Sequence, residues 1–108
     1  MSGCYEAPPW SAGPFDPAAA VTACIESGAP CVLFDDGTLP PEFFDLSTGV
    51  AGAMVQRLVT YGIRMAVVVP DPSVHSRPFQ DFAREASAGK QFRFFPDRKR
   101  AMEWLASE

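Results

Sequence analysis

The stretch that most constrains the fold is residues 43–69, which read FFDLSTGVAGAMVQRLVTYGIRMAVVV. Two aromatic residues and an acid lead into a small-residue turn at 47–49. A segment with apolar residues at steps of three and four follows, as in a helix with one buried face. Gly62 ends that segment, and the nearly all-apolar run 63–69 is typical of a strand covered on both faces. The stretch therefore predicts a helix that leads into the central strand of an α/β domain.

We expect Ser47 or Thr48 to cap this helix, because a side-chain oxygen there can accept a hydrogen bond from the first helical N–H groups. Its polar side is predicted to carry Gln56, Arg57 and Thr60. The opposite side should form one buried stripe. The predicted stripe consists of Val50, Ala51, Met54, Val55, Leu58 and Val59.

Three further helices and two further strands are predicted around this unit. One helix begins at Asp16 and ends at Gly28, a second is opened by Ser76 and Pro78, and the last starts at Asp97. Strands are predicted at 31–35 and 91–95. The order α-β-α-β-α-β-α predicts one α/β domain over residues 15–108, with a parallel-type sheet and flanking helices.

Residues 1–14 form a proline-rich arm, and proline blocks regular structure there. We expect an extended arm that is either frayed or packs Tyr5 and Trp10 on the domain or on a partner subunit. Cys4 falls in this arm, whereas Cys24 and Cys31 occupy core positions. Three cysteines without a CxxC spacing are interpreted as structural thiols.

Composition excludes several classes of function. With 108 residues, the chain is long enough to bury a core as one domain. A net charge of -4 argues against nucleic-acid binding, which requires a basic surface. Apolar runs stay far below the roughly 20 residues of a membrane span, and the first residues lack signal-peptide character. We therefore expect a cytoplasmic protein that binds neither nucleic acid nor membrane.

From Phe43 onward, the chain resembles an uncharacterised bacterial family known as domain of unknown function 4180. The signature of that family is close to FFDL-x-TG-x-AGE-x-x-Q-K-x-x-N-Y before a basic, apolar strand, and residues 43–69 are similar to it. Residues 79–95 resemble a later family element, a helix with an acid and GK before an aromatic strand. Residues 101–105 resemble its terminal A-x-x-W/L-L helix. The chain departs from the signature at Ala53, Arg57 and Thr60, where the family has Glu, Lys and Asn.

More distantly, the strand–DLSTG–helix–strand pattern resembles the sulfate-transporter and anti-sigma-factor-antagonist (STAS) module. This resemblance implies a small STAS-like domain. In that module a serine at the start of the helix is phosphorylated to switch partner binding, and Ser47 or Thr48 is the matching position. The resemblance implies a non-catalytic, partner-switching regulatory module as one function.

A second function follows from a subgroup of proteins that look like this domain. They act in the biosynthesis of cinnamycin- and duramycin-type lanthipeptides, where they promote addition of a lysine amine to a dehydroalanine to close a lysinoalanine bridge. The resemblance implies a peptide-modifying enzyme that needs no metal and no organic cofactor. It remains one of three hypotheses, because a small-molecule binding protein with its site at the strand-end loops also fits the fold.

An amine addition of this kind needs a templated substrate, donors for the developing enolate and a base. Gln56 and Arg57 are the predicted donors, although both also suit a merely solvated helix face. His75 is the predicted base on the protein, since it is the only histidine and lies in a loop after a strand, and a carboxylate of the substrate is the alternative base. The predicted substrate contacts are Glu42, Phe43, Phe44, Asp45 and Tyr61. Phe43 and Phe44 are expected to split between the core and a groove, so that one of them receives an apolar side chain of the substrate.

These assignments have structural alternatives. Asp45 also suits a helix cap, Tyr61 suits a half-buried packing position, and a loop histidine is commonly just solvated. The partner is expected to be a peptide substrate or a protein. The apolar surplus and the aromatic arm also favour a homodimer.

Overall fold

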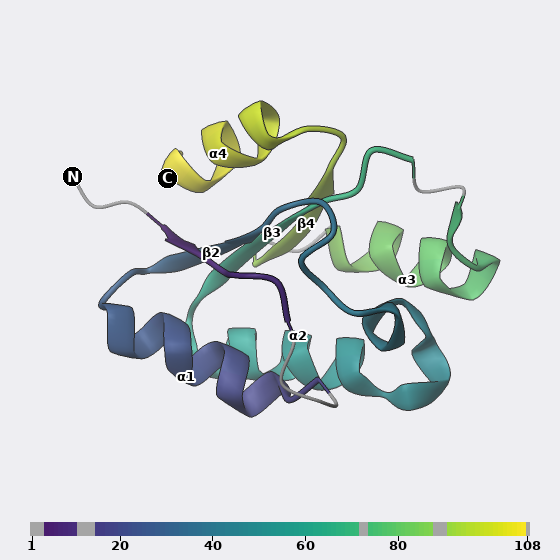
Figure 1. Ribbon diagram of the computed structural model, residues 1–108, viewed down its shortest axis with the longest axis horizontal. Helices are drawn as coiled ribbons and strands as arrows, with labels where there is room; N and C mark the ends of the chain where they lie inside the picture. The colour runs from purple at the N-terminus through teal and green to yellow at the C-terminus, as the bar shows by residue number, and fades with distance from the viewer. Residues whose placement is uncertain (1–3, 11–14, 72–73, 88–90, 108) are drawn as a thin grey trace.

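The computed structural model describes residues 4–10, 15–71, 74–87 and 91–107. Within these ranges the chain forms four parallel strands and four α-helices, which confirms the predicted α/β class (Figure 1). Two short 3-10 helices, η1 and η2, precede α2. The elements are β1 (Tyr5–Glu6), α1 (Pro17–Ser27), β2 (Cys31–Phe34), η1 (Pro41–Phe44), η2 (Leu46–Thr48), α2 (Val50–Tyr61), β3 (Arg64–Val68), α3 (Arg77–Ser87), β4 (Phe92–Phe95) and α4 (Arg98–Ala106).

The sheet follows the order of the chain, β1-β2-β3-β4, and every pair is parallel. One row of the register runs from Tyr5 through Val32 and Met65 to Phe92. Side chains of residues in one such row point to the same face of a sheet. Because all pairs are parallel, the carboxyl ends of the four strands lie at one edge of the sheet.

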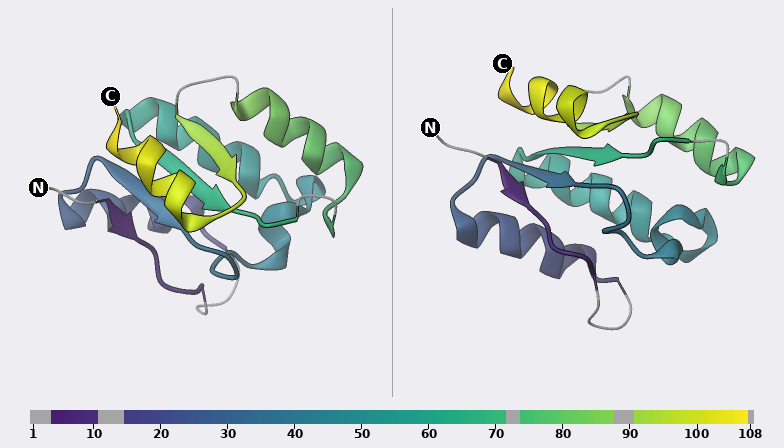
Figure 2. Two further views of the ribbon diagram at one scale, coloured as in Figure 1. Left: turned by 90° about the horizontal axis from the view of Figure 1, so that it is seen from above. Right: turned by 45° about the horizontal axis from the view of Figure 1, so that its top comes forward.

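The helices cover both faces of the sheet unequally. Figure 2 shows α1, α2 and α3 on one face and α4 alone on the other. Alternate residues of each strand divide between the two cores, because successive side chains point to opposite faces. Val32, Met65 and Phe92 face the larger core with α1, α2 and α3. Leu33, Ala66 and Val68 face the smaller core with Ala101 and Leu105 of α4.

The start of α2 differs from the sequence prediction. Gly49, not Ser47 or Thr48, is the N-cap, and its φ of 78° is left-handed. Thr48 Oγ1 donates backwards to the carbonyl oxygens of Glu42 and Asp45 at 2.9 and 2.8 Å, and these contacts fold 46–48 into η2. The same oxygen accepts a hydrogen bond of 3.4 Å from the N–H of Val50, the first residue of α2, so the predicted role of Thr48 is confirmed in part although Gly49 is the N-cap residue.

The buried stripe of α2 is narrower than predicted. Ala51, Met54 and Leu58 are completely buried, Val50 and Val55 are half-buried, and Val59 is 60 % exposed. Positions 51, 54 and 58 lie on one helical line, whereas 59 is turned about 100° away from 58. The assignment of Val59 to the stripe was therefore wrong.

Four helix boundaries agree with the sequence prediction. Asp16 caps α1, and its Oδ1 accepts a hydrogen bond from the Ala18 N–H at 3.0 Å. Gly28 and Gly62, with φ values of 79° and 67°, end α1 and α2 in the left-handed conformation that glycine adopts without a steric penalty. Asp97 likewise caps α4 through the Arg100 N–H.

The described part of the arm joins the sheet. Residues 5 and 6 pair with β2, and the side chains of Tyr5 and Trp10 pack against the larger core. Cys4 lies beside Cys31, and the two form a disulfide with a Cα–Cα distance of 4.8 Å. The interpretation of all three cysteines as thiols was therefore wrong, while Cys24 is a buried free thiol whose pKa is raised by that burial.

Candidate functional site

Two neighbouring pockets lie at the carboxyl ends of β2 and β3, and both are lined by Val69 and His75. We name the first the α3 pocket and the second the acidic pocket. The α3 pocket has a volume of about 270 Å³ and is lined by Val69, His75, Phe79, Gln80, Ala83, Arg84 and Phe94. The acidic pocket has a volume of about 340 Å³ and is lined by Asp35, Asp36, Gly37, Leu39, Phe44, 67–71, Val74 and His75.

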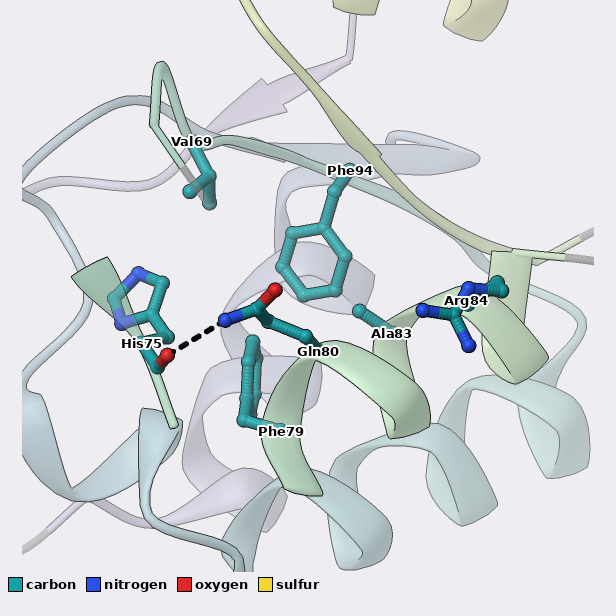
Figure 3. A pocket seen from close by; sticks show the side chains of 7 residues that line it. All are labelled: Val69, His75, Phe79, Gln80, Ala83, Arg84 and Phe94. Atoms are coloured by element: carbon teal, nitrogen blue, oxygen red, sulfur yellow. Dashed lines mark hydrogen bonds between the residues drawn. The ribbon is translucent and has the colours of Figure 1, made fainter. Parts of the chain in front are cut away.

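Two elements, η1 and α3, hold His75 at the junction of these pockets. The ring stacks on Phe44 of η1, with 4.1 Å between ring centroids and an interplanar angle of 6°. Phe79 of α3 contacts it edge-on at 5.5 Å. The backbone carbonyl of His75 accepts a hydrogen bond of 2.8 Å from Gln80 Nε2 (Figure 3). His75 is therefore a positioned residue and not a loosely solvated one.

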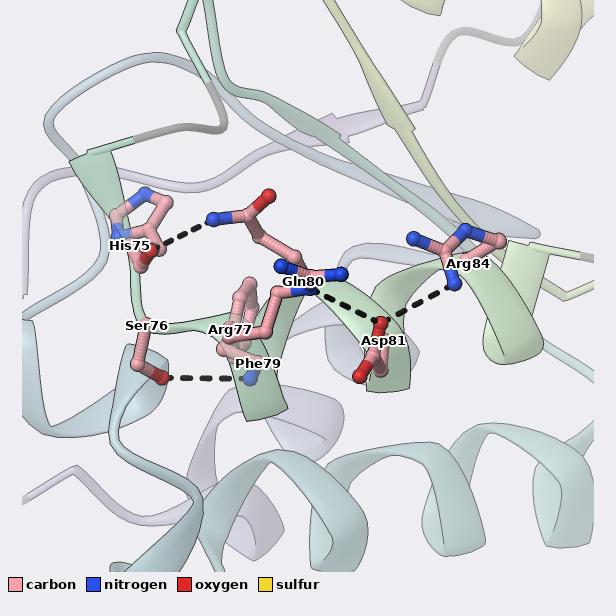
Figure 4. Close-up of polar contacts among 7 residues, drawn as sticks. All are labelled: His75, Ser76, Arg77, Phe79, Gln80, Asp81 and Arg84. Atoms are coloured by element: carbon pink, nitrogen blue, oxygen red, sulfur yellow. Dashed lines mark hydrogen bonds and ion pairs between the residues drawn. The ribbon is translucent and has the colours of Figure 1, made fainter.

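The local sequence explains why α3 starts beside this histidine. Ser76 Oγ accepts a hydrogen bond from the Phe79 N–H at 3.3 Å, and the Ser76 carbonyl accepts one from the Gln80 N–H at 3.0 Å (Figure 4). A serine at this position satisfies the first N–H groups of a helix. The cap fixes the direction of α3, and with it the positions of Phe79 and Gln80 in the α3 pocket.

The surroundings of His75 favour its neutral form. Burial lowers the pKa of His75 below its ordinary value, and the nearby carboxylate of Asp71 partly opposes this effect. A histidine whose pKa falls below 6.5 is mostly uncharged at neutral pH, so one ring nitrogen can accept a proton. The site therefore contains a weak base held against aromatic walls.

Polar donors lie along the other side of the α3 pocket. Figure 3 shows His75 and Arg84 at opposite ends, with the carboxamide of Gln80 between them. Arg84 and Arg77 both approach Asp81, with N–O distances of 3.1 and 3.9 Å (Figure 4). A carboxamide and a guanidinium can donate to a carbonyl or carboxylate oxygen. The pocket thus combines an acceptor, two donors and an apolar wall.

The acidic pocket carries negative charge on apolar walls. Asp35, Asp36 and Asp71 contribute carboxylates at the ends of β2 and β3. Arg98 of α4 reaches Asp35 at 3.1 Å and Glu6 of β1 at 2.7 Å, and these two carboxylates raise the pKa of Arg98. Val74 at this pocket is 71 % exposed. Such a pocket suits a long apolar side chain that ends in a positive charge.

The predicted donors on α2 lie elsewhere. Gln56, Arg57 and Tyr61 line a separate, open depression with Gly52, Ala53 and Thr60. Gln56 and Arg57 are exposed, and Tyr61 is 54 % exposed. Among the described residues, none lines both this depression and either pocket at the strand ends. The structure therefore does not bring Gln56 and Arg57 together with His75.

The other predicted contacts also separate. Phe43 is completely buried among aromatic rings, so it belongs to the core and has no surface for a substrate. Phe44 is half-buried on His75. Asp45 accepts hydrogen bonds from the Ser47 hydroxyl and N–H at 2.7 and 3.0 Å, which lower its pKa and bind it into the local turn. Glu42 is half-buried in η1, beside Phe43.

Sequence reasoning missed Asp71, Gln80 and Arg84. A signal for two of them existed, because Gln80 and Arg84 are four residues apart and so share one face of the helix that follows His75. Asp71 follows the central strand by three residues, at the edge where parallel sheets bind ligands. Phe79 is buried in the core, and it also forms part of the α3 pocket.

Fold and pockets together define a small α/β domain whose candidate site lies at the carboxyl edge of a parallel sheet. The chain belongs to the family described as domain of unknown function (DUF4180), whose model matches residues 16–105. Neither the curated proteins nor the solved structures contain a significant match to the chain.

Among the described residues, the acidic, histidine and cysteine side chains form no group of three or more that could hold a metal ion. In the same part of the chain, the helices are too short or too polar to cross a membrane.

Proposed function

We propose that this protein promotes lysinoalanine formation in a lanthipeptide, by binding the peptide and placing a lysine amine beside a dehydroalanine. The observation that carries this proposal is the position of the His75 imidazole, which stacks on Phe44 at the junction of an acidic and a donor-lined pocket. The proposal keeps the function inferred from the sequence and keeps His75 as the base, but it moves the donor role from Gln56 and Arg57 to Gln80 and Arg84.

The acidic pocket is the proposed seat of the lysine side chain. Its apolar walls, including Leu39 and Phe44, suit the methylene groups, and Asp36 and Asp71 suit the ammonium group. The exposed Val74 supplies an apolar contact for the rest of the peptide. Charge complementarity therefore selects the amine partner and brings it to the imidazole.

The α3 pocket is the proposed seat of the dehydroalanine. The carbonyl oxygen of the dehydroalanine would accept a hydrogen bond from the Gln80 carboxamide, whose Nε2 also donates to the His75 carbonyl. Arg84 at the far end would bind a second carbonyl or a carboxylate of the peptide. Donors aimed at the carbonyl stabilise the negative charge that develops when the alkene is attacked.

The reaction balances without a cofactor. His75 accepts a proton from the lysine ammonium, and the freed amine forms an N–C bond to the β-carbon of dehydroalanine. The electron pair of the C=C bond moves to the α-carbon and its carbonyl, and the imidazolium returns the proton to the α-carbon. Holding both groups in reach supplies the proximity effect, and the base contributes a further factor of about 10²–10⁴ in rate.

The test is incubation of the full chain with a dehydrated, thioether-bridged lanthipeptide, followed by tandem mass spectrometry. We expect a new ring at unchanged mass, and no ring when the peptide lysine is replaced by norleucine. A peptide with arginine in place of lysine separates binding from reaction, because it keeps the charge. If several dehydrated peptides remain open after incubation, the proposal fails.

A second candidate is a STAS-like regulatory module that binds a partner protein. The observation that favours it is the exposed hydroxyl of Ser47 just before α2. Against it, that hydroxyl donates to the Asp45 carboxylate, whose negative charge would repel a phosphoryl group there. A Ser47→Asp variant that releases or captures a protein partner would favour this alternative. The predicted cytoplasmic location and homodimeric state stay predictions.

A further inference from the structure

We propose that residues 4–10 form a redox-controlled strap across the edge of β2, latched by the Cys4–Cys31 disulfide and released when a dithiol reduces it. The inference goes beyond the proposed function and does not rest on His75. We use the name strap for residues 4–10 from here on.

Few backbone contacts hold the strap. Its strand, β1, is two residues long and pairs with Val32 and Leu33. Beyond that strand, the Ala7 N–H donates to the Leu33 carbonyl at 3.0 Å and the Trp10 N–H donates to the Thr38 carbonyl at 2.9 Å. So short a strand at the edge of a sheet is among the parts of a fold that open most easily.

The strap lies outside the part of the chain that matches the family model. That match begins at residue 16, after the strap. Cys31, the partner of Cys4, lies inside the match, at the first residue of β2. The disulfide therefore ties the strap to the central sheet.

The side chains of the strap face three alanines and one phenylalanine. Tyr5 and Trp10 line one wall of a pocket with Ala7, Pro8 and Pro9, and its other wall is Ala19, Ala20 and Ala23 of α1 and Phe34 of β2. Trp10 meets Phe15 edge-on at 4.9 Å. Alanine side chains bury little apolar surface, so this contact stabilises the strap less than packing in a deep core would.

Two ion pairs of Arg98 extend the latch toward the acidic pocket. Arg98 connects Glu6 of β1 with Asp35, which lines that pocket. All three side chains are close to half exposed, so solvent and salt screen their attraction. These ion pairs by themselves therefore do not retain the strap, and the covalent link is the dominant constraint.

Release is a balanced thiol–disulfide exchange. One thiolate of the dithiol attacks the sulfur of Cys4, which is half-buried, while Cys31 is buried and leaves as a thiolate. The second thiol of the reagent then displaces Cys4. Two electrons and two protons pass to the protein, the S–S bond becomes two thiols, and the dithiol becomes a cyclic disulfide.

Hydrogen-deuterium exchange with mass spectrometry on the full chain, oxidised and then reduced with dithiothreitol, tests the proposal. We expect reduction to remove the protection of the Ala7 and Trp10 amides and of the β2 edge, while β3 keeps its protection. Cys4→Ser should show the released pattern without reductant. Cys24→Ala is the matched control, since it removes the free thiol and should respond to reductant as the unmodified protein does.

Counting alkylated thiols after denaturation checks the latch itself. The oxidised protein should take up one alkyl group, on Cys24, and the reduced protein three. Three alkylated thiols in air-oxidised protein would overturn the proposal. Unchanged hydrogen exchange of the strap after reduction would also overturn the proposal, because the pairing of β1 with β2 would then hold the strap without the disulfide. Loss of protection in β3 would overturn it by showing that the bond supports the whole fold.

Discussion

Two surfaces of this domain carry the side chains that its chemistry would use, and they differ in how they are built. The outer face of α2 presents Gln56, Arg57 and Tyr61 from a single helix, over an open depression. The carboxyl edge of the sheet presents His75 where η1, the end of β3 and α3 meet.

The difference shows that a side chain is shielded from water only where several helices and loops meet around it. On α2 the side chains stand in solvent, whereas at the sheet edge Phe44 and Phe79 remove water from one imidazole and lower its pKa. A polar helix face is easy to recognise in a sequence, but the spacing of residues on one helix does not create the walls of a pocket. We therefore place the chemistry at His75 and treat the α2 face as the matched control surface.

The largest effect is expected from His75→Gln. Loss of the base should slow lysinoalanine closure by about 10²–10⁴-fold, the usual contribution of general base catalysis, while glutamine keeps the polar volume. The measurement is the closure rate by tandem mass spectrometry, with circular dichroism as the control for folding. If this variant closes the ring at the original rate, His75 is not the base, and the outer face of α2 becomes the better candidate site.

A smaller effect is expected from Phe44→Ala. Removing a half-buried ring that stacks on His75 should cost about 1–3 kcal/mol of unfolding free energy, below the usual loss for a fully buried phenylalanine. Tyr61→Ala, an exposed aromatic on α2, should change stability by no more than about 0.5 kcal/mol. Urea unfolding of both variants measures the difference, and equal losses would show that the stack on His75 adds nothing.

A pH dependence should distinguish the two surfaces further. Because burial lowers the pKa of His75 in the folded protein, protonation favours the unfolded chain. Stability from this group is complete above the unfolded value of about 6.5 and is lost as the pH falls through the lower, folded pKa. Urea unfolding across this window should show the slope, and His75→Gln should abolish that part of it.

Asp71 sharpens the same measurement. Its carboxylate raises the pKa of His75, so Asp71→Asn should lower that pKa further and move the window to lower pH. NMR titration of the imidazole protons reads the value directly, because the chain contains one histidine. A titration midpoint at or above the ordinary value would contradict the burial described for the ring.

The smallest effect is expected from Arg57→Ala and Gln56→Ala. Both side chains are exposed on α2, so stability should change by no more than about 0.5 kcal/mol and ring closure should proceed at the original rate. A large loss of closure in Arg57→Ala, with intact stability, would reverse the assignment of the two surfaces.

Much of the fold is predictable from local patterns. Asp16, Gly28 and Gly62 mark helix boundaries, and the apolar run 63–69 correctly indicates a central strand, because caps and periodicity act over a few residues. The strand β1 is not predictable in this way. Two residues followed by prolines have no period to detect, and their pairing with β2 depends on the rest of the sheet.

The site is predictable only in part. His75 is found from its place after a strand, but its stacking on Phe44 joins residues 31 positions apart and depends on the path of the loops. Phe43 and Phe44 are chemically identical neighbours, and the geometry of η1 alone sends one to the core and the other to the pocket. The Cys4–Cys31 bond was missed for the same reason, since it requires the register of β1.

The chain-order arrangement of the sheet has a consequence for biosynthesis. Each new strand emerges from the ribosome beside its finished neighbour, so the sheet can assemble progressively during translation. The face that bears Leu33, Ala66 and Val68 nevertheless stays uncovered until α4 has been made. We expect nascent chains arrested at residue 96 to bind a chaperone or a hydrophobic dye that the finished protein does not. Equal dye binding by arrested and finished chains would refute this expectation. The risk of aggregation is thus greatest before α4 is made, and it falls when α4 covers this apolar face.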